Sequence, residues 1–148
     1  HQGASFVEIY TNCIVYNDGA FSSFAEKSTA ADGELVLEHG QPMIFGQDRD
    51  KGIRMKPGAI ELEVVQLGVD GVTEADLLCH DETNRVLAGL LGAMHNPEFP
   101  VAVGVLYCED AEAYDTAVYQ QVDAARAADG VADINTLLRS GATWTVGD

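Results

Sequence analysis

The sequence predicts an α/β fold, and three patterns support that prediction. Residues 4–10 and 101–107 form apolar runs of strand length, and apolar side chains on both faces are typical of buried parallel strands. Residues 60–67 begin with the apolar–polar alternation of a half-buried strand. Residues 86–94 place apolar side chains three or four positions apart, which indicates a helix with one buried face.

Composition limits the classes of function. The chain has 148 residues, of which 47% are hydrophobic, and this is enough for one domain with a packed core. Its net charge of −16 repels phosphate backbones and anionic lipid headgroups, so we expect neither nucleic-acid binding nor membrane-surface binding. No apolar run reaches the roughly 20 residues that a membrane-spanning helix needs. Most of the carboxylates are expected only to solvate the surface.

The three cysteines, Cys13, Cys79 and Cys108, are widely spaced along the chain. They form no Cys-x-x-Cys pair, and their spacing matches no zinc signature. An odd number of cysteines without a secretion signal favours a reducing compartment, so we expect a cytoplasmic protein.

The first apolar run ends in a polar turn around Cys13. Residues 4–10 lead through a polar pair to Cys13, and the Asn-Asp-Gly of residues 17–19 is a strong turn signal. Because ligand sites in open α/β sheets lie beyond the carboxyl ends of strands, Cys13 is placed where such a site would form. The strand pattern starts almost at the first residue and without an initiator Met, so we expect a fragment that begins between a helix and a strand of a larger domain.

Residues 20–58 are the least regular part of the sequence. Short strands are predicted at residues 35–37 and 42–46, and the polar segment 47–52 is expected to close a hairpin onto residues 53–55. Apolar residues recur throughout, so we interpret this part as an excursion from the main sheet and not as a linker.

The second half of the chain is mainly helical. Residues 73–76 have the spacing of a capping box, and Asn84 stands where the next helical pattern begins. Residues 111–128 show the clearest helical pattern, and a shorter helix is predicted at residues 133–139. The two apolar faces consist of Val86, Leu87, Leu90, Leu91 and Met94, and of Tyr114, Val118, Val122 and Ala125. Trp144 is expected to pin the tail against a core or a partner.

Several segments, in their order and spacing, resemble one enzyme family. SFVEIYTNC followed by VYNDGAF resembles a junction in β subunits of 2-oxoacid:ferredoxin oxidoreductases, where the last strand of the thiamine-diphosphate domain runs into a cysteine and an aromatic-Asn-Asp turn. The segments that follow there resemble LEHGQPMIFG, DKGIRMK, LEVVQLG, LLCHDE, PVAVGVLY and LLRSGATWTV. The resemblance covers nearly the whole chain, and it is closer to the 2-oxoglutarate members than to the pyruvate members.

The resemblance implies a division of the chain and an activity. Residues 1–19 would be the end of a thiamine-diphosphate-binding parallel sheet, and residues 20–148 a C-terminal α/β extension of the β subunit. The implied reaction is the oxidative decarboxylation of 2-oxoglutarate to succinyl-coenzyme A (2-oxoglutarate synthase), with electrons passed through a [4Fe–4S] cluster to ferredoxin. The implied cofactors are thiamine diphosphate, Mg²⁺ and the cluster, and the implied partners are an α subunit, ferredoxin, coenzyme A and the 2-oxoacid.

The resemblance also implies roles for particular residues. Cys13 would be one of four cluster ligands, and the other three ligands and the Gly-Asp-Gly motif for diphosphate and Mg²⁺ would lie outside this chain. These 148 residues alone are therefore expected to be inactive, and no catalytic residue is assigned within them. Asn17 and Asp18 directly follow the cluster cysteine and are candidates for binding the cofactor, with an ordinary turn as the alternative.

Two further groups of residues have alternative interpretations. His39 and His80 are possible acid–base groups, but without a nucleophile nearby we expect them to buttress loops. The basic residues of segment 49–56 are either a solvated hairpin or a surface that contacts ferredoxin, coenzyme A or the partner subunit.

Two other functions stay open at this point. The substrate is alternatively pyruvate or another 2-oxoacid. The chain is alternatively a non-catalytic acidic interaction domain that lacks the cofactor site.

Overall fold

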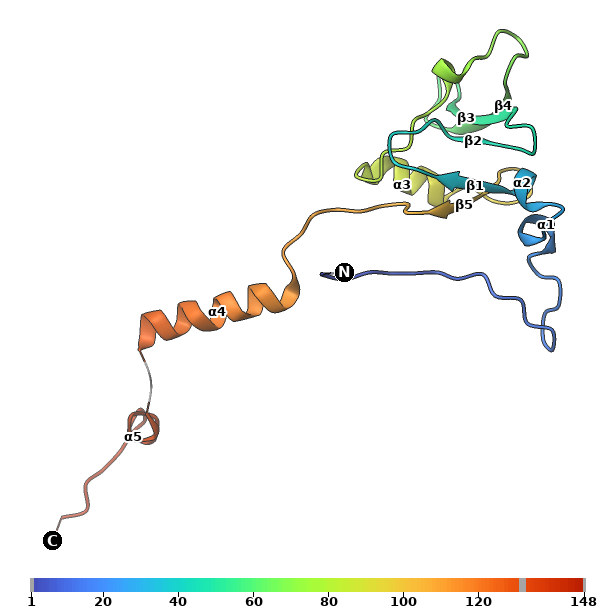
Figure 1. The fold of residues 1–148 in the computed structure, drawn as a ribbon. Helices are drawn as coiled ribbons and strands as arrows, with labels where there is room; N and C mark the ends of the chain where they lie inside the picture. The colour runs from blue at the N-terminus through green and yellow to red at the C-terminus, as the bar shows by residue number, and fades with distance from the viewer. Residues whose placement is uncertain (1, 131–132, 148) are drawn as a thin grey trace. The chain divides into compact units, whose positions relative to one another are not determined.

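The structure is a computed structural model that describes residues 2–130 and 133–147 (Figure 1). The chain divides into two compact units, and their relative position is not defined. The larger unit is Glu8–Glu109, and the smaller one combines His1–Val7 with Asp110–Asp148. Among the described residues, no helix has the length and apolarity that crossing a membrane requires.

The larger unit contains two small sheets and short helices. Its elements are α1 (Ser22–Ala25), α2 (Ala30–Gly33), β1 (Glu34–Leu37), β2 (Ile44–Phe45), β3 (Lys51–Met55), β4 (Leu62–Gln66), the 3₁₀ helix η1 (Glu74–Asp76), α3 (Arg85–Gly92) and β5 (Val101–Gly104). β1 pairs with β5 in parallel, and β2, β3 and β4 form an antiparallel sheet in that order. This mixture of helices with a parallel and an antiparallel sheet confirms the predicted α/β class.

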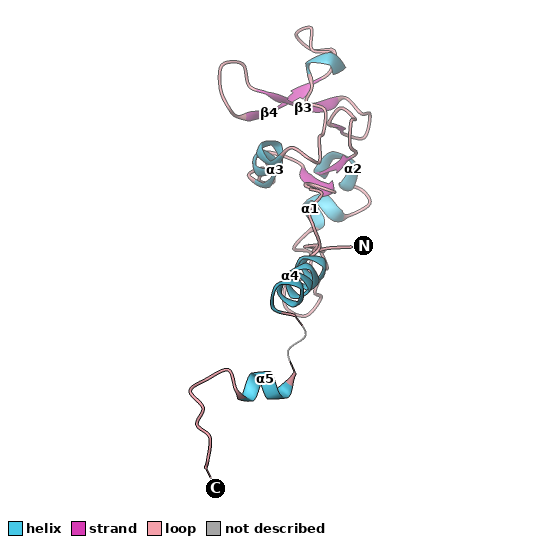
Figure 2. Cartoon of the chain, turned by 90° about the vertical axis from the view of Figure 1, so that its left-hand side faces the viewer, coloured by secondary structure: helices cyan, strands magenta, loops and turns pink. Residues whose placement is uncertain are grey.

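The two sheets differ in the sequence separation of their paired strands. In the antiparallel sheet, Lys51 lies opposite Gln66 and Met55 opposite Leu62, so its strands are joined by short local connections. In the parallel sheet, Glu34 lies opposite Val101, and more than sixty residues separate these partners. Figures 1 and 2 show α1, α2 and α3 on the same side of the three-stranded sheet.

The core of the larger unit is small and almost entirely aliphatic. Leu35, Met43 and Ile53 are the most deeply buried apolar side chains, with exposures of 0 to 1%. They pack with Leu37, Phe45, Leu87 and Leu91. The core therefore joins the first two strands of the unit, the middle strand of the antiparallel sheet and one face of α3.

Several local predictions are confirmed. The strands β2 and β4 lie within the predicted segments, whereas β1 begins one residue and β3 two residues earlier than predicted. Strand β5 covers residues 101–104 of the run predicted at residues 101–107. The capping box forms as predicted, because the Thr73 backbone and hydroxyl groups both donate to Asp76 Oδ2 at 2.8 Å. Asn84 caps α3, since its Oδ1 accepts from the Val86 and Leu87 backbone N–H groups at 3.1 Å.

The prediction of a buried strand at residues 4–10 is wrong for the described structure. These residues have no strand assignment and are all exposed; Phe6 is 91% exposed and Ile9 is 76% exposed. Neither of the two sheets contains a strand from this segment. The apolar pattern therefore indicates residues that are suited to burial, although their side chains are exposed in the structure.

The apolar helix faces are confirmed only in part. In α3, Leu87 and Leu91 are buried, but Val86 is 70% exposed, because the helix presents only one narrow side to the core. The smaller unit contains α4 (Tyr114–Asp129), which ends one residue beyond the predicted helix, and α5 (Ile134–Leu138), which lies within its predicted segment. On α4, the Tyr114 side chain is 85% exposed. The Trp144 side chain in the C-terminal segment is also 85% exposed. The contact of Trp144 with a core or a partner therefore stays a prediction.

Candidate functional site

Cys13 lies in a tight turn that local hydrogen bonds close. The backbone N–H of Asn17 donates to the Cys13 carbonyl at 3.0 Å. The side chain of Asn12 spans the turn, because its Nδ2 donates to Asp18 Oδ1 at 2.9 Å and its Oδ1 accepts from the Gly19 backbone N–H at 3.0 Å. Gly19 has a φ of +73°, a conformation that favours glycine. Asn12 thus joins the two ends of the turn that presents Cys13.

The environment of the Cys13 sulfur favours the thiolate. The backbone N–H groups of Tyr16 and, next, Val15 donate to it and lower the pKa of the thiol below its usual value. The residue is exposed, so burial opposes this shift only weakly. An exposed thiolate is the form of cysteine that binds metals and attacks electrophiles. The turn therefore fits the role of a single thiolate ligand.

Aromatic contacts connect the Cys13 turn to the first helices. The Tyr10 ring meets the Phe21 ring edge-on at 5.3 Å and the Phe24 ring at 5.4 Å between centroids. Phe24 packs in turn against Gly33, where an added Cβ would lie 2.6 Å from the Phe24 Cα. This chain of contacts runs from the residues before Cys13 through α1 to the residue that precedes β1.

Asn17 and Asp18 lie in the same turn as Cys13. Asn17 contributes its backbone to the bridge with Cys13, and one Asp18 carboxylate oxygen accepts from Asn12. Both arrangements stabilise the turn itself, as the alternative interpretation expected. The structure thus brings the three predicted site residues together, and their role in binding a cofactor stays a prediction.

The other two cysteines do not join Cys13 in a metal site. Cys79 forms an isolated bridge with Pro42, and the Cys108 backbone N–H donates to the Glu82 carbonyl at 2.8 Å. Both are free thiols. Within residues 2–130 and 133–147, no three His, Cys, Asp or Glu side chains gather in a way that could hold a metal ion. Cys13 can therefore supply one ligand of a cluster, and the described part of the chain does not supply the rest.

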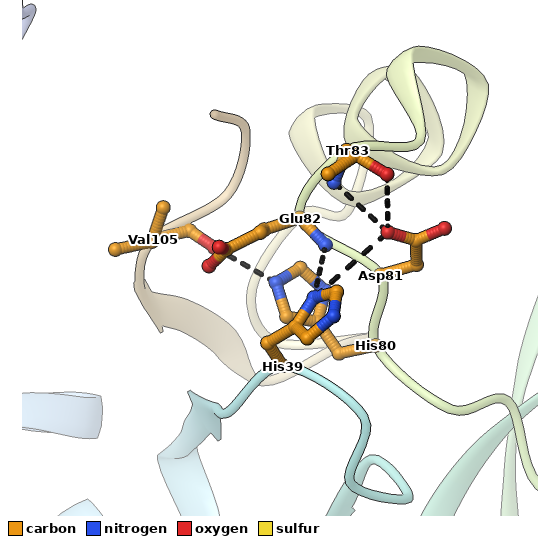
Figure 3. A network of polar contacts seen from close by, with 6 residues as sticks. All are labelled: His39, His80, Asp81, Glu82, Thr83 and Val105. Carbon is orange, nitrogen blue, oxygen red and sulfur yellow. Dashed lines mark hydrogen bonds and ion pairs between the residues drawn. The ribbon is translucent and has the colours of Figure 1, made fainter. Parts of the chain in front are cut away.

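The histidines buttress loops, as expected. His80 is buried, and its Nε2 lies 2.8 Å from the Val105 carbonyl, so the ring ties the end of β5 to the segment before α3 (Figure 3). This contact requires a proton on Nε2. The His80 backbone also accepts from Gly40 at 2.7 Å and donates to Gln41 at 2.8 Å. His80 thus connects three segments of the larger unit.

Asp81 does not orient His80. Its Oδ1 instead accepts from the Thr83 hydroxyl at 2.7 Å and from the Thr83 backbone N–H at 2.9 Å, and these bonds lower the pKa of the Asp81 carboxyl (Figure 3). His39 Nδ1 accepts from the Glu82 backbone N–H at 3.3 Å and lies 3.9 Å from Asp81 Oδ1. The hydrogen bond needs an Nδ1 that accepts and the ion pair needs an Nδ1 that carries a proton, so the two contacts are alternatives.

Carboxylates from neighbouring segments neutralise most of the basic segment 49–56. Three of its four cations form ion pairs: Lys51 Nζ with Asp32 Oδ1 at 2.8 Å, Arg54 Nε with Glu63 Oε1 at 2.6 Å and Lys56 Nζ with Glu61 Oε2 at 3.4 Å. Cations already paired within the chain attract an acidic partner less strongly. The geometry therefore favours the solvated hairpin over the docking surface for ferredoxin or coenzyme A.

One polar cluster was missed by the sequence analysis. Arg85 Nη2 donates to Glu109 Oε2 at 2.8 Å, and the Tyr107 hydroxyl donates to the same oxygen at 2.7 Å. The Tyr107 hydroxyl, followed by the Arg85 guanidinium, lowers the pKa of the Glu109 carboxyl. Arg85 and Glu109 lie 24 positions apart, so no local motif could have indicated this contact. The cluster is exposed and joins the start of α3 to the segment after β5.

Comparison with known proteins gives one informative match. No protein-family model matches the sequence, and no solved structure matches it significantly. The chain is 28% identical over 149 aligned residues to the 2-oxoglutarate oxidoreductase subunit KorB of Mycobacterium tuberculosis (strain ATCC 25618 / H37Rv). The match covers 99% of this chain and 39% of the relative, so the chain spans about two fifths of the length of the curated relative it matches. Along nearly its whole length, the chain is thus similar to part of a subunit of a 2-oxoacid oxidoreductase.

Proposed function

We propose that this chain is the C-terminal part of the β subunit of a 2-oxoglutarate:ferredoxin oxidoreductase. The observation that carries the proposal is the similarity to KorB, which extends over 99% of the chain and is not confined to one motif. The proposed reaction is the oxidative decarboxylation of 2-oxoglutarate to succinyl-coenzyme A, with ferredoxin as the electron acceptor. KorB is named as a subunit, which supports an assembly that also contains an α subunit.

In this proposal Cys13 supplies one thiolate to a [4Fe–4S] cluster. Two observations support that role: the side chain is exposed, and backbone N–H groups stabilise its ionised form. Asn12 holds the turn closed, so that the sulfur and its donors keep a fixed arrangement. The cluster would supply a one-electron carrier between the two-electron oxidation of the substrate and ferredoxin.

Asn17 and Asp18 have a more limited role in the proposal. They lie in the Cys13 turn, so they would line the cofactor cleft if Cys13 binds the cluster beside it. Thiamine diphosphate, held with Mg²⁺, would supply the electron sink for decarboxylation. The residues that bind its diphosphate are not proposed within this chain, and coenzyme A is proposed only as the acyl acceptor of the whole enzyme.

The cluster assignment is tested by comparing the three cysteines in the intact complex with the α subunit. We expect Cys13→Ala to lose the iron–sulfur absorbance and the cluster's electron paramagnetic resonance signal. Cys79→Ala and Cys108→Ala are matched controls, because both are also free and exposed, and they should retain both signals. A Cys13→Ala complex with full iron content and an unchanged signal would refute the assignment.

The substrate assignment is tested separately with the unmodified complex. Turnover is measured with 2-oxoglutarate, pyruvate and a branched 2-oxoacid, with coenzyme A and ferredoxin supplied. We expect the highest kcat/KM with 2-oxoglutarate. A preference for pyruvate would move the chain to the pyruvate-specific enzymes, and no turnover of any 2-oxoacid would support the non-catalytic interaction domain.

A further inference from the structure

One face of β1 is left uncovered by the larger unit. The side chains of Leu35 and Leu37 point into the core, whereas Val36 between them is 62% exposed. Strands in parallel sheets are normally covered on both faces, because their side chains are apolar on both sides. Within the larger unit, β1 pairs with β5, and Val36 on its outer face stays exposed.

A hollow of about 330 Å³ lies on this uncovered face. Val36 forms part of its apolar lining, together with Ala30 and Ala31 from α2 and Ile44 and Phe45 from β2. The hollow is therefore built by three consecutive elements of the well-packed part of the unit. It is large enough for side chains of an incoming segment and lies along the strand.

The apolar surface has one carboxylate at each of its two ends. Glu34 and Glu38 line the hollow on the same side of β1 as Val36, because alternate residues of a strand share one face. Within the described part of the chain, neither carboxylate takes part in an ion pair. Arg49 also lines the hollow, so its net charge remains negative. The pattern along β1 is acidic, apolar, acidic with a spacing of two residues.

We propose that this hollow binds an extended segment of a partner protein, in which an apolar residue is flanked two positions away on each side by lysine or arginine. Glu34 and Glu38 are four residue steps apart and therefore about 13 Å from each other, and an extended chain repeats its same-face side chains at a matching interval of about 6.6 Å. The apolar residue covers Val36, and the two cations pair with the two carboxylates. A second copy of this chain is disfavoured as the occupant by its net charge of −16.

The test uses the full chain and a synthetic peptide with the core Lys-Thr-Val-Thr-Lys. Binding is followed by ¹H–¹⁵N nuclear magnetic resonance at low salt. We expect saturable shifts of amides in β1 and α2, and affinity about tenfold higher than for a peptide of equal composition with adjacent lysines, because two ion pairs are gained. Equal affinity for both peptides would overturn the proposal, since net charge alone would then explain binding.

A charge exchange tests the placement of the peptide. The double variant Glu34→Lys with Glu38→Lys should lose the preference for the basic peptide and prefer the core Glu-Thr-Val-Thr-Glu instead. The control variant Glu26→Lys with Glu98→Lys changes the net charge equally at exposed positions outside the hollow and should keep the original preference. If both double variants behave alike, the hollow is not the binding site.

The apolar contact is tested with a pair of exposed valines. Val36→Lys should abolish the shifts in β1, whereas Val86→Lys on α3 should leave them unchanged. Far-ultraviolet circular dichroism confirms that each variant is folded before titration. Retained binding in Val36→Lys would exclude contact with this face. None of these outcomes depends on Cys13 or on the proposed reaction, so the two proposals fail independently.

Discussion

The two sheets of the larger unit and the Cys13 turn are stabilised in different ways. The sheets bury Leu35 and Ile53 completely, so tertiary contacts hold them together. The turn buries none of its side chains: Ile14 is 78% exposed and Tyr16 is 91% exposed, and local hydrogen bonds through Asn12 close it. The candidate ligand thus lies in a segment that has no buried side chain. Local hydrogen bonds hold the turn with the candidate ligand, whereas buried apolar side chains hold the two sheets.

The largest expected change in stability distinguishes the buried face of β1 from its exposed face. Leu35→Ala removes a fully buried side chain from the core and should lower the free energy of unfolding by about 2–5 kcal/mol. Val36→Ala, at the next position, should change it by no more than about 0.5 kcal/mol because Val36 is exposed. Urea unfolding of both variants checks this, and equal effects would mean that β1 is not packed as described.

The next effect tests the connection between α1 and β1. A methyl group at Gly33 would lie 2.6 Å from the Phe24 Cα, so backbone must move, and Gly33→Ala should cost about 1–3 kcal/mol of stability. Gly89→Ala is the matched control. Its added methyl meets nothing within 4 Å, and in the middle of α3 it should stabilise by about 0.5–1 kcal/mol. Thermal unfolding should show a lower melting temperature for Gly33→Ala and a higher one for Gly89→Ala.

A smaller effect is expected on the stability of the protein at low pH. The Thr73 backbone and hydroxyl groups hold the pKa of Asp76 below its usual value of 3.8. A lowered pKa means that the ionised carboxylate stabilises the folded state, so its contribution is complete above the usual carboxyl range and is lost as the pH falls through the lowered pKa. Asp76→Asn should therefore reduce the loss of stability between neutral pH and pH about 3. Urea midpoints of both proteins at the two pH values measure it, and an unchanged difference would exclude this role for Asp76.

The smallest effect on stability is expected in the Cys13 turn itself. Asn12→Ala removes both side-chain bonds of an exposed turn and should change the free energy of unfolding by no more than about 0.5 kcal/mol. The pKa of the Cys13 thiol should nevertheless rise, because its backbone donors are no longer held in place. Alkylation of Cys13 at neutral pH, followed by mass spectrometry, should become slower. A large loss of stability instead would show that the turn supports the core.

Much of the local structure could be predicted because neighbouring residues decide it. The capping box of residues 73–76 and the cap at Asn84 need only side chains two or three positions away. The location of Cys13 in a turn followed from the Asn-Asp-Gly signal after it. The closing role of Asn12 was missed, since an asparagine side chain can bond many different backbone groups and only the folded turn selects one.

The sequence by itself determined the class of the fold, most strands and helices, and the resemblance from which Cys13 was predicted as a cluster ligand. Periodicity, caps and turn residues act over a few positions, so they survive in the sequence as readable patterns. Only the tertiary structure decided that Glu34 pairs with Val101, that carboxylates neutralise the basic hairpin and that residues 4–10 lie exposed. These outcomes depend on which distant segments come into contact in the folded chain. A hydrophobic pattern indicates which residues are suited to burial, but burial is non-directional, so the pattern does not indicate the surface that covers them.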